Sequence, residues 1–373
     1  MERYQKKYIL KDLNKKLVFL IGPRQVGKTW LAQDIAKLFS NSVYLNYDNF
    51  KDRKIIINQS WLNDTNLLIL DEIHKMPDWK NFVKGVYDTK PFTMKMLITG
   101  SARLEIFHAG GDSMAGRFFK HRLLPFSASE LSHINENIDM DRLLLHGGFP
   151  EPFLSDDIVE SDRWRMQYVN GLIRTDVLDF EKIHDFKAIE LVFQLLRSRV
   201  GSPISYQSIA EDVGIAPNTV KKYIQIFESL FLVFRVVPYS NNIARSLLKE
   251  PKIYFFDTGM VEGNKGVRFE NLVAVSLLKH VYAINDYLGK PYSLNYLRTK
   301  DKAEVDFCIV TKNGPKVMIE AKLSNDTLGK SIVNFNRRYN IPGILLVLNL
   351  KQEREEKNIE IRKGVKYLSS LMM

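Results

Sequence analysis

Residues 17–29 read LVFLIGPRQVGKT, and this stretch decides the fold of the N-terminal region. The apolar run LVFLI predicts a buried strand, and TWLAQDIAKLF, which begins at Thr29, predicts the helix that follows. The phosphate-loop pattern G-x-x-x-x-G-K-[ST] links them and comprises Gly22, Pro23, Arg24, Gln25, Val26, Gly27, Lys28 and Thr29. Its glycines let backbone N–H groups and the helix N-terminus approach phosphates closely. We expect Lys28 to reach the β- and γ-phosphates and the Thr29 hydroxyl to ligate Mg²⁺.

A second element, residues 67–79, reads LLILDEIHKMPDW. Its apolar residues predict a buried strand, and Asp71 and Glu72 stand at the carboxyl end, the edge where open α/β sheets hold ligands. We expect Asp71 to hold Mg²⁺ through its water shell and Glu72 to act as the general base on the attacking water. The alternative is a strand that ends in solvated acids, which the upstream phosphate loop disfavours.

A third strand, in MKMLITGSAR, ends in polar side chains that could orient the lytic water. Here the sequence resembles the AAA+ ATPases, whose corresponding strand carries a polar sensor; Thr99 and Ser101 both match that position. The resemblance also implies an arginine before the last strand that reaches a neighbour's nucleotide site. Arg117 stands there, and Arg103 and Arg122 are weaker candidates. The alternative for Arg117 is a surface arginine paired with a carboxylate.

The pattern of apolar runs divides the chain. Short apolar runs alternate with helical patterns up to about Ser129, which predicts an α/β fold with a parallel sheet covered by helices. Amphipathic segments broken by glycines then predict a helical lid, followed by helices with a strand pair and by a mixed helix and strand region. The predicted boundaries are 1–130 for the P-loop ATPase core, 131–185 for the lid, 186–250 for a winged helix-turn-helix and 251–373 for the C-terminal domain.

Residues 204–230, ISYQSIAEDVGIAPNTVKKYIQIFESL, have the spacing of a helix-turn-helix. Ala210 allows the helices to cross, Gly214 makes the turn and Val220 anchors the second helix. We expect Asn218 to cap that helix and the strands around FLVFRVVPYS to add a wing. The candidate DNA-contacting residues are Asn218, Thr219, Lys221, Lys222 and Gln225. Such modules also serve as protein interfaces.

The C-terminal region contains carboxylates in a nuclease-like order. Glu270 stands in an apolar-periodic helix, Asp306 in a strand, and Glu320 and Lys322 on one face of the next strand. Two carboxylates can hold Mg²⁺, and a lysine beside them can stabilise hydroxide or developing phosphate charge. This order resembles the restriction-endonuclease-like core D-x(n)-[DE]-x-K. The alternative is a hairpin with exposed charges.

A resemblance to one bacterial and archaeal family spans nearly all of the chain. It is carried by GPRQVGKT, LLILDEIHKMPDW, ITGSARL, GRFFKHRLLPFSASEL, LHGGFPE, PKIYFFDTGM and EVDF with IEAK. Members of that family fuse an AAA-type ATPase to a C-terminal domain of unknown function that combines a winged helix with a restriction-endonuclease-like α/β fold. The resemblance implies ATP and Mg²⁺ as cofactors, ATP hydrolysis and a link to DNA. No clear second sensor arginine stands in the lid, where Arg142, Arg163 and Arg174 are the candidates.

Composition limits the class of protein. The 373 residues carry 54 Lys and Arg against 43 Asp and Glu, a net charge of +11 that permits an anionic partner such as nucleic acid. No apolar run approaches the roughly 18 residues of a membrane span, and the N-terminus lacks the pattern of a secretory signal. The single cysteine, Cys308, suits a reducing compartment. We therefore expect a cytoplasmic protein with no membrane contact.

Three functions fit these observations. The preferred one is an ATP-hydrolysing, homo-oligomeric machine, such as a hexamer, that remodels or translocates duplex or branched DNA. The second is an ATP-regulated, Mg²⁺-dependent nuclease that uses Asp306, Glu320 and Lys322. The third is a nucleotide-controlled switch without nuclease activity.

Overall fold

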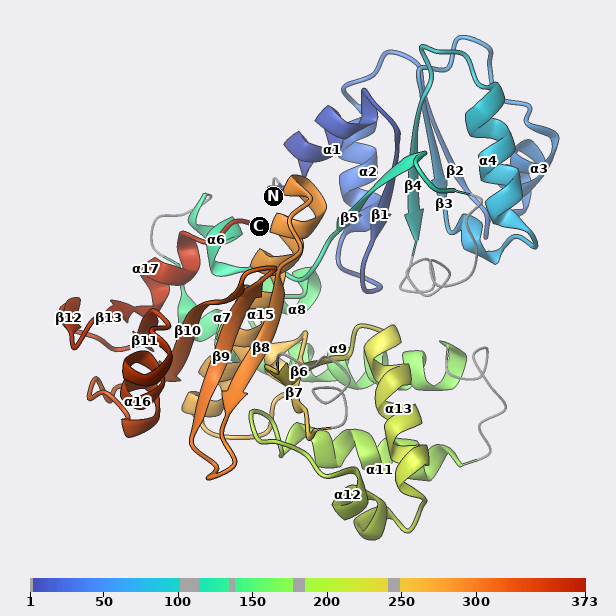
Figure 1. Cartoon of the computed structure of the whole chain (residues 1–373). Coiled ribbons are helices and arrows are strands. Elements are labelled where there is room, and N and C mark those ends of the chain that lie inside the picture. Colours follow the sequence, from blue (N-terminus) through green and yellow to red (C-terminus); the bar gives the residue numbers. More distant parts are fainter. Residues whose placement is uncertain (1–2, 101–113, 134–137, 177–184, 241–248) are drawn as a thin grey trace. The chain divides into compact units, whose positions relative to one another are not determined.

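The computed structural model (Figure 1) describes residues 3–100, 114–133, 138–176, 185–240 and 249–373. The chain separates into two compact units, residues 1–124 and 125–373. The second unit therefore contains the three regions that the sequence predicts as lid, winged helix-turn-helix and C-terminal domain. None of the helices in the described ranges is long and apolar enough to cross a membrane.

The first unit is built on a parallel sheet. In the described residues its strand order is β2-β3-β4-β1-β5. The chain therefore starts inside the sheet at β1, crosses to the edge strand β2, returns through β3 and β4, and ends at the other edge with β5. The strands are β1 (Leu17–Ile21), β2 (Ser42–Asn46), β3 (Leu67–Asp71), β4 (Lys95–Gly100) and β5 (Phe118–Arg122). Every residue of β1 and β3 is buried, because parallel sheets are covered on both faces.

Helices cover both faces of this sheet. They are α1 (Lys6–Leu13), α2 (Lys28–Ala36), α3 (Phe50–Asn58) and α4 (Trp79–Thr89), with the short turn η1 (Ile73–Lys75) after β3. Figure 1 shows α1 and α2 on one side of the sheet and α3 and α4 on the other. Phe19 of β1 packs edge to face against Trp79 of α4, with ring centroids 6.0 Å apart, in a core that also contains Ile56 of α3. Leu17 and Ile21, the alternate residues on either side of Phe19, belong to the same core, so one face of β1 points towards α3 and α4.

The second unit contains a larger mixed sheet with the order β12-β13-β11-β10-β9-β8-β6-β7. Its strands are β6 (Val233–Pro238), β7 (Lys252–Phe255), β8 (Ser293–Arg298), β9 (Glu304–Thr311), β10 (Gly314–Lys322), β11 (Gly343–Val347), β12 (Arg354–Glu356) and β13 (Ile359–Lys363). The 24-residue helix α15 (Lys265–Leu288) packs against β7, β8 and β10. The buried thiol of Cys308, on β9, has a pKa raised to about 12 by burial.

The remaining helices of the second unit are mostly short. They are α6 (Ala128–Ser132), α7 (Met140–His146), α8 (Pro150–Leu154), α9 (Ile158–Gly171), η3 (Leu172–Asp176), α11 (Phe186–Arg197), α12 (Tyr206–Val213), α13 (Pro217–Ser229), η4 (Thr258–Met260), α16 (Lys330–Tyr339) and α17 (Gly364–Ser369). The turn η3 is a π-helix directly after α9.

The strand pair that the sequence assigns to a wing belongs to the large sheet. β6 pairs antiparallel with β7, as a wing would, and Val233 lies opposite Phe255. However, β6 also pairs in parallel with β8, through Val237 and Asn295. β7 lies beyond the predicted boundary at residue 250, so that boundary cuts through a hydrogen-bonded strand pair. Backbone pairing therefore joins the two predicted domains.

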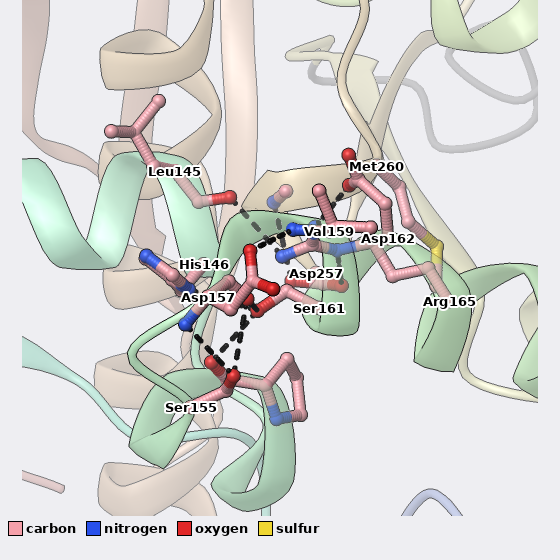
Figure 2. Close-up of polar contacts among 12 residues, drawn as sticks. Leu145, His146, Ser155, Asp157, Val159, Ser161, Asp162, Arg165, Asp257 and Met260 are labelled. Atoms are coloured by element: carbon pink, nitrogen blue, oxygen red, sulfur yellow. Dashed lines mark hydrogen bonds and ion pairs between the residues drawn. The ribbon is translucent and has the colours of Figure 1, made fainter.

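A buried ion pair ties the predicted lid to the C-terminal region (Figure 2). Arg165 of α9 donates from Nε to Asp257 Oδ2 at 2.9 Å, and its other nitrogens bond Asp162 Oδ1 and the Leu145 carbonyl. A Cβ added to Gly147 would lie 1.5 Å from Asp257 Oδ1, and one added to Gly259 would lie 2.0 Å from an Arg165 nitrogen. The segments LHGGFPE and PKIYFFDTGM thus meet at this pair, where glycine gives the room for it.

The candidate lid arginines differ in their surroundings. Arg142 donates to the Phe153 and Ser155 carbonyls and to Asp156, so its guanidinium holds the link between α8 and α9. Arg163 and Arg174 are exposed. Among the described arginines of this region, Arg165 is the most buried, and the sequence pattern did not single it out.

Candidate nucleotide site and neighbouring clusters

The phosphate loop runs from the end of β1 into α2, at the carboxyl edge of the sheet. A Cβ on Gly22 would lie 2.1 Å from the carbonyl oxygen of Leu123, which directly follows β5, so only glycine fits at this position. Gly27 has φ +96°, a left-handed conformation that disfavours other residues, and it forms the N-cap of α2. The first N–H groups of α2 have no carbonyl partner within the helix, so they can receive an anion.

The Lys28 side chain is buried under the loop. Its Nζ donates to the carbonyl oxygens of Gly22, at 3.1 Å, and Pro23, at 2.6 Å. Burial lowers the pKa of Lys28 to about 8, against the opposing effect of Glu72 and Asp71. The ammonium lies under the loop where a phosphate would be bound, and the nearby carboxylates only partly offset the loss of its hydration. The negative charge of a bound phosphate would stabilise the charged form of Lys28.

Asp71 is the centre of a hydroxyl cluster. Its Oδ2 accepts from the Thr29 hydroxyl at 3.0 Å and from the Tyr44 hydroxyl at 2.5 Å, and its Oδ1 accepts from the Thr99 hydroxyl. Strand register produces this arrangement, because Asp71 lies opposite Asn46 on one side and Thr99 on the other. Adjacent hydroxyl and carboxylate oxygens are the ligands that Mg²⁺ prefers, so Thr29 and Asp71 fit the predicted magnesium role.

Glu72 directly follows β3 in a left-handed conformation, with φ 55°. Its Oε2 lies 3.5 Å from both the Lys75 Nζ and the His74 Nε2. Burial raises the pKa of Glu72, and the nearby Lys28 and Lys75 oppose that rise. A raised pKa makes the carboxylate a better proton acceptor, which is the property that a general base needs.

The predicted sensor and finger residues lie in different places. Thr99 is buried and contacts Asp71, whereas Ser101 and Arg103 lie outside the described residues. Arg117 precedes β5 at the amino end of the sheet, while the phosphate loop follows the carboxyl end of β1. A five-residue strand spans roughly 15 Å, so Arg117 cannot reach the nucleotide of its own chain. Its guanidinium instead forms a two-point pair with Asp88 of α4, at 2.8 and 3.1 Å.

The helices α12 and α13 match the predicted helix-turn-helix spacing. Ala210 and Val220 are buried, and Gly214 has φ +79° at the end of α12. The predicted cap is wrong: Ala216 is the N-cap of α13, Pro217 follows in its first turn, and Asn218 lies within the helix. Proline suits that first position because it needs no N–H partner. The candidate DNA-contacting side chains that are exposed are Asn218, Lys221, Lys222 and Gln225, and Thr219 is half-buried.

The nuclease-like residues gather around a lysine that the sequence analysis missed. Lys252 of β7 is buried, and its Nζ lies 2.7 Å from Glu304, 3.6 Å from Asp306 and 3.9 Å from Glu270. Burial alone would lower the pKa of Lys252, but Asp306, Glu270 and Glu304 outweigh it and raise the pKa. We call Lys252, Glu270, Glu304 and Asp306 the Lys252 cluster.

The other predicted nuclease residues flank this cluster. Lys322 Nζ bonds Glu320 Oε1 at 3.0 Å, and Asp306 Oδ2 accepts from the Ala321 N–H at 3.0 Å. Burial, followed by repulsion from Asp306, raises the pKa of Glu270 to about 7. Tyr254 donates to Glu270 Oε1 at 2.8 Å.

The expected nuclease magnesium, which rests on two carboxylates, stays a prediction. Within the described ranges, no group of three or more His, Cys, Asp or Glu side chains is arranged to hold a metal ion. The Lys252 ammonium places one positive charge between Glu304, Asp306 and Glu270 and so partly compensates these carboxylates.

Three residues of these sites thus escaped the sequence analysis: Tyr44, Lys252 and Glu304. Tyr44 could have been suspected, because it shares a face of β2 with Asn46, and Asn46 lies opposite Asp71 on the neighbouring strand β3. Lys252 carried no motif of its own. It reaches Glu270 and Asp306 only because β7 pairs with β6 at the edge of the large sheet.

Comparison with known families divides the chain in three. Residues 14–132 match the family model described as an AAA domain. Residues 137–268 and 265–368 match two domains of unknown function, DUF8612 and DUF4143. With the parallel sheet and the phosphate loop, these matches support an AAA-type P-loop ATPase followed by the C-terminal DUF4143.

Individual relatives are distant. An uncharacterized protein of Mycobacterium tuberculosis is 23% identical over 330 residues, which cover 85% of this chain and 72% of the relative. One of Methanocaldococcus jannaschii is 26% identical over 366 residues, covering 88% and 80%. Among solved structures, a Walker-type ATPase of Pyrococcus abyssi is 14% identical with TM-score 0.46, covering 72% of this chain and 95% of its own. The RuvB Holliday junction branch migration motor of Thermotoga maritima is 19% identical with TM-score 0.30, covering 63% and 88%.

Proposed function

We propose that this chain, which carries an AAA-type P-loop domain over residues 14–132, hydrolyses ATP and couples hydrolysis to remodelling or translocation of duplex or branched DNA in a homo-oligomer. The observation that carries the ATPase part is the Asp71 cluster, in which Thr29 and Thr99 bond the two carboxylate oxygens beside the phosphate loop. The DNA part rests on the exposed polar face of α13 and on the net charge of +11.

The site residues divide the work of hydrolysis. Lys28 leaves the Gly22 and Pro23 carbonyls and pairs with the β- and γ-phosphates, while the loop N–H groups hold the same oxygens. Bound Mg²⁺, held by Thr29 and by Asp71 through water, would supply positive charge to the phosphates. Glu72 takes the proton of the attacking water, and Thr99 keeps the Asp71 carboxylate in position.

The proposed DNA contact rests on the exposed polar side of α13. Lys221, Lys222 and Gln225 lie on one exposed side, whereas Val220, Ile224 and Phe227 are buried on the other. Lysine and amide side chains on an exposed helix can contact phosphates and base edges. Loss of Lys221 should therefore weaken binding to all sequences and reduce its salt dependence.

The test is Mg²⁺-dependent ATP hydrolysis by the full chain, measured alone and with single-stranded, duplex and four-way-junction DNA at two stated salt concentrations. We expect hydrolysis and stimulation by duplex or junction DNA, both absent in Lys28→Ala. The matched variant Glu72→Gln should bind ATP but lose turnover by about 10² to 10⁴-fold. Turnover that no DNA form changes would contradict the coupling, and Lys28→Ala that hydrolyses ATP normally would contradict the site.

A further inference from the structure

A groove in the second unit combines basic and aromatic side chains and belongs to none of the sites above. It lies along the end of β8, the turn between β9 and β10, and the C-terminal end of α16. Its main cavity has a volume of about 820 Å³, and an adjoining cavity of about 420 Å³ shares Phe335, Arg338 and Tyr339 with it. We call the two together the α16 groove.

The lining of the α16 groove is strongly positive. Among the described residues, five basic side chains line it against one acid, Asp301; the basic residues are Lys249, Arg298, Lys300, Arg337 and Arg338. Arg298 lies 3.7 Å from Glu250 and from Glu304. In the part of the chain that the structure describes, the other four have no carboxylate within ion-pair distance. Uncompensated cations in a concave surface concentrate the positive potential there and attract a polyanion.

Aromatic and amide groups lie among these cations. Tyr339 is 51% exposed at the end of α16, Arg338 lies over its ring at 5.4 Å, and Phe335 packs beside it with ring centroids 5.7 Å apart. An exposed ring beside a guanidinium offers a flat face on which a base can stack. Asn313 and Asn340 line the same cavity and can bond base edges.

These features distinguish between anionic partners. An acidic protein or a lipid headgroup would use the positive charge but not a stacking ring. Duplex DNA would use the charge, but its bases are already stacked inside the helix, so Tyr339 would have no base to contact. A single strand uses both, because its phosphates follow the basic side chains and its unpaired bases can enter a cavity of this size.

We infer that the α16 groove binds single-stranded nucleic acid. The inference goes beyond the proposed function, which places duplex or branched DNA on α13. The groove also adjoins the Lys252 cluster, because Glu304 lies near both Lys252 and Arg298.

The test is fluorescence anisotropy of labelled oligothymidylate with the full chain, without nucleotide, at two salt concentrations. Tyr339→Ala should weaken binding roughly five- to 150-fold, the range for loss of one stacking residue. Arg338→Ala should weaken binding and lower the salt dependence by about one phosphate contact. Both side chains are exposed, so folding should be unchanged. Lys290→Ala, an exposed cation that lines neither cavity, is the charge-matched control and should bind as the wild type does.

DNA-stimulated ATP hydrolysis, measured on the same variants, separates this inference from the proposed function. Groove-dependent binding without any stimulation would support the groove and contradict the coupled ATPase. Stimulation with normal oligothymidylate binding by Tyr339→Ala and Arg338→Ala would overturn the groove alone. Wild-type protein that does not bind oligothymidylate would overturn it too. Displacement of oligothymidylate by equal concentrations of polyglutamate or anionic vesicles would show a general polyanion surface and would also overturn it.

Discussion

At the scale of single residues, the charge state of Lys28 controls the affinity of the nucleotide site. Its ammonium is buried with two carbonyl partners and no direct carboxylate contact in the described residues, and burial lowers its pKa to about 8. A bound phosphate would favour the charged form and raise that pKa again. Nucleotide binding above pH 8 must therefore be accompanied by proton uptake.

This argument predicts a pH dependence of ATP affinity. Between pH 7 and 8 the dissociation constant should change little, and above pH 8 it should rise by up to about tenfold per pH unit as free Lys28 loses its proton. Isothermal titration calorimetry in two buffers of different ionisation enthalpy measures both affinity and proton uptake. Lys28→Met should bind weakly with no rise above pH 8. A flat profile for the wild type would contradict the lowered pKa.

Glu270 predicts a second pH effect, this time on stability. Burial and Asp306 raise its folded-state pKa to about 7, above the ordinary value of 4.5. A group with a raised pKa stabilises the fold fully below its unfolded value, and that contribution is lost as the pH rises towards 7. Glu270→Gln stays neutral and keeps a partner for Tyr254, so it should gain stability relative to the wild type between pH 5 and 7.5, on the order of 3 kcal/mol.

Thermal unfolding across that pH range measures the effect. The matched control is Glu355→Gln, which changes an exposed glutamate on β12 and should follow the wild type at every pH. A constant difference between Glu270→Gln and the wild type would show that Lys252 keeps Glu270 ionised throughout.

At the scale of elements, the turn between α12 and α13 depends on one backbone conformation. Gly214 accepts φ +79°, and its N–H and that of Ile215 both bond the Ala210 carbonyl to end α12. A Cβ at Gly214 would meet no atom within 4 Å, so the cost of a side chain there is conformational and not steric.

Gly214→Ala should therefore destabilise the second unit by about 1 kcal/mol. The matched control is Gly171→Ala, at the end of α9, where a Cβ also meets no atom but the backbone is helical; it should be neutral or stabilise by about 0.5 to 1 kcal/mol. Urea unfolding compares the two. Equal effects would mean that the left-handed turn is not retained in solution.

At the scale of the whole molecule, Arg117 requires a second copy to act on nucleotide. It lies at the amino end of its own sheet and pairs with Asp88, which lowers the pKa of that carboxyl. The pair is exposed, and exposed ion pairs contribute little to stability, so a neighbour's phosphate can compete for the guanidinium. Arg117→Ala should lower turnover by 10³-fold or more, whereas Asp88→Ala should not lower it.

Mixing inactive variants tests the direction of this contact. A site with an intact Lys28 from an Arg117→Ala subunit can be completed by Arg117 of a Lys28→Ala neighbour. The mixture should therefore recover part of the turnover that each variant lacks alone. No recovery, with both variants still assembling, would place the activating arginine elsewhere.

The nucleotide site could be predicted from the sequence because its parts are local. Strand, loop and helix are contiguous from Leu17 to Ala36, and Asp71 and Thr99 each follow a strand of the same parallel sheet. The wing and the nuclease magnesium stay predictions. The sequence did not reveal that β6 also pairs with β8 or that Lys252 lies among the carboxylates, because both depend on pairing between distant segments.

The amino-acid sequence by itself determined the phosphate loop, the acidic strand end, the helix pair with its turn at Gly214, and the positive net charge. Each of these depends on local backbone preference, side-chain period or composition. Only the tertiary structure decided that Tyr44 and Thr99 share Asp71, that Lys252 lies among three carboxylates and that α16 ends beside a basic groove. Sheet order and register bring these side chains together, and a local pattern does not encode which distant strands will pair.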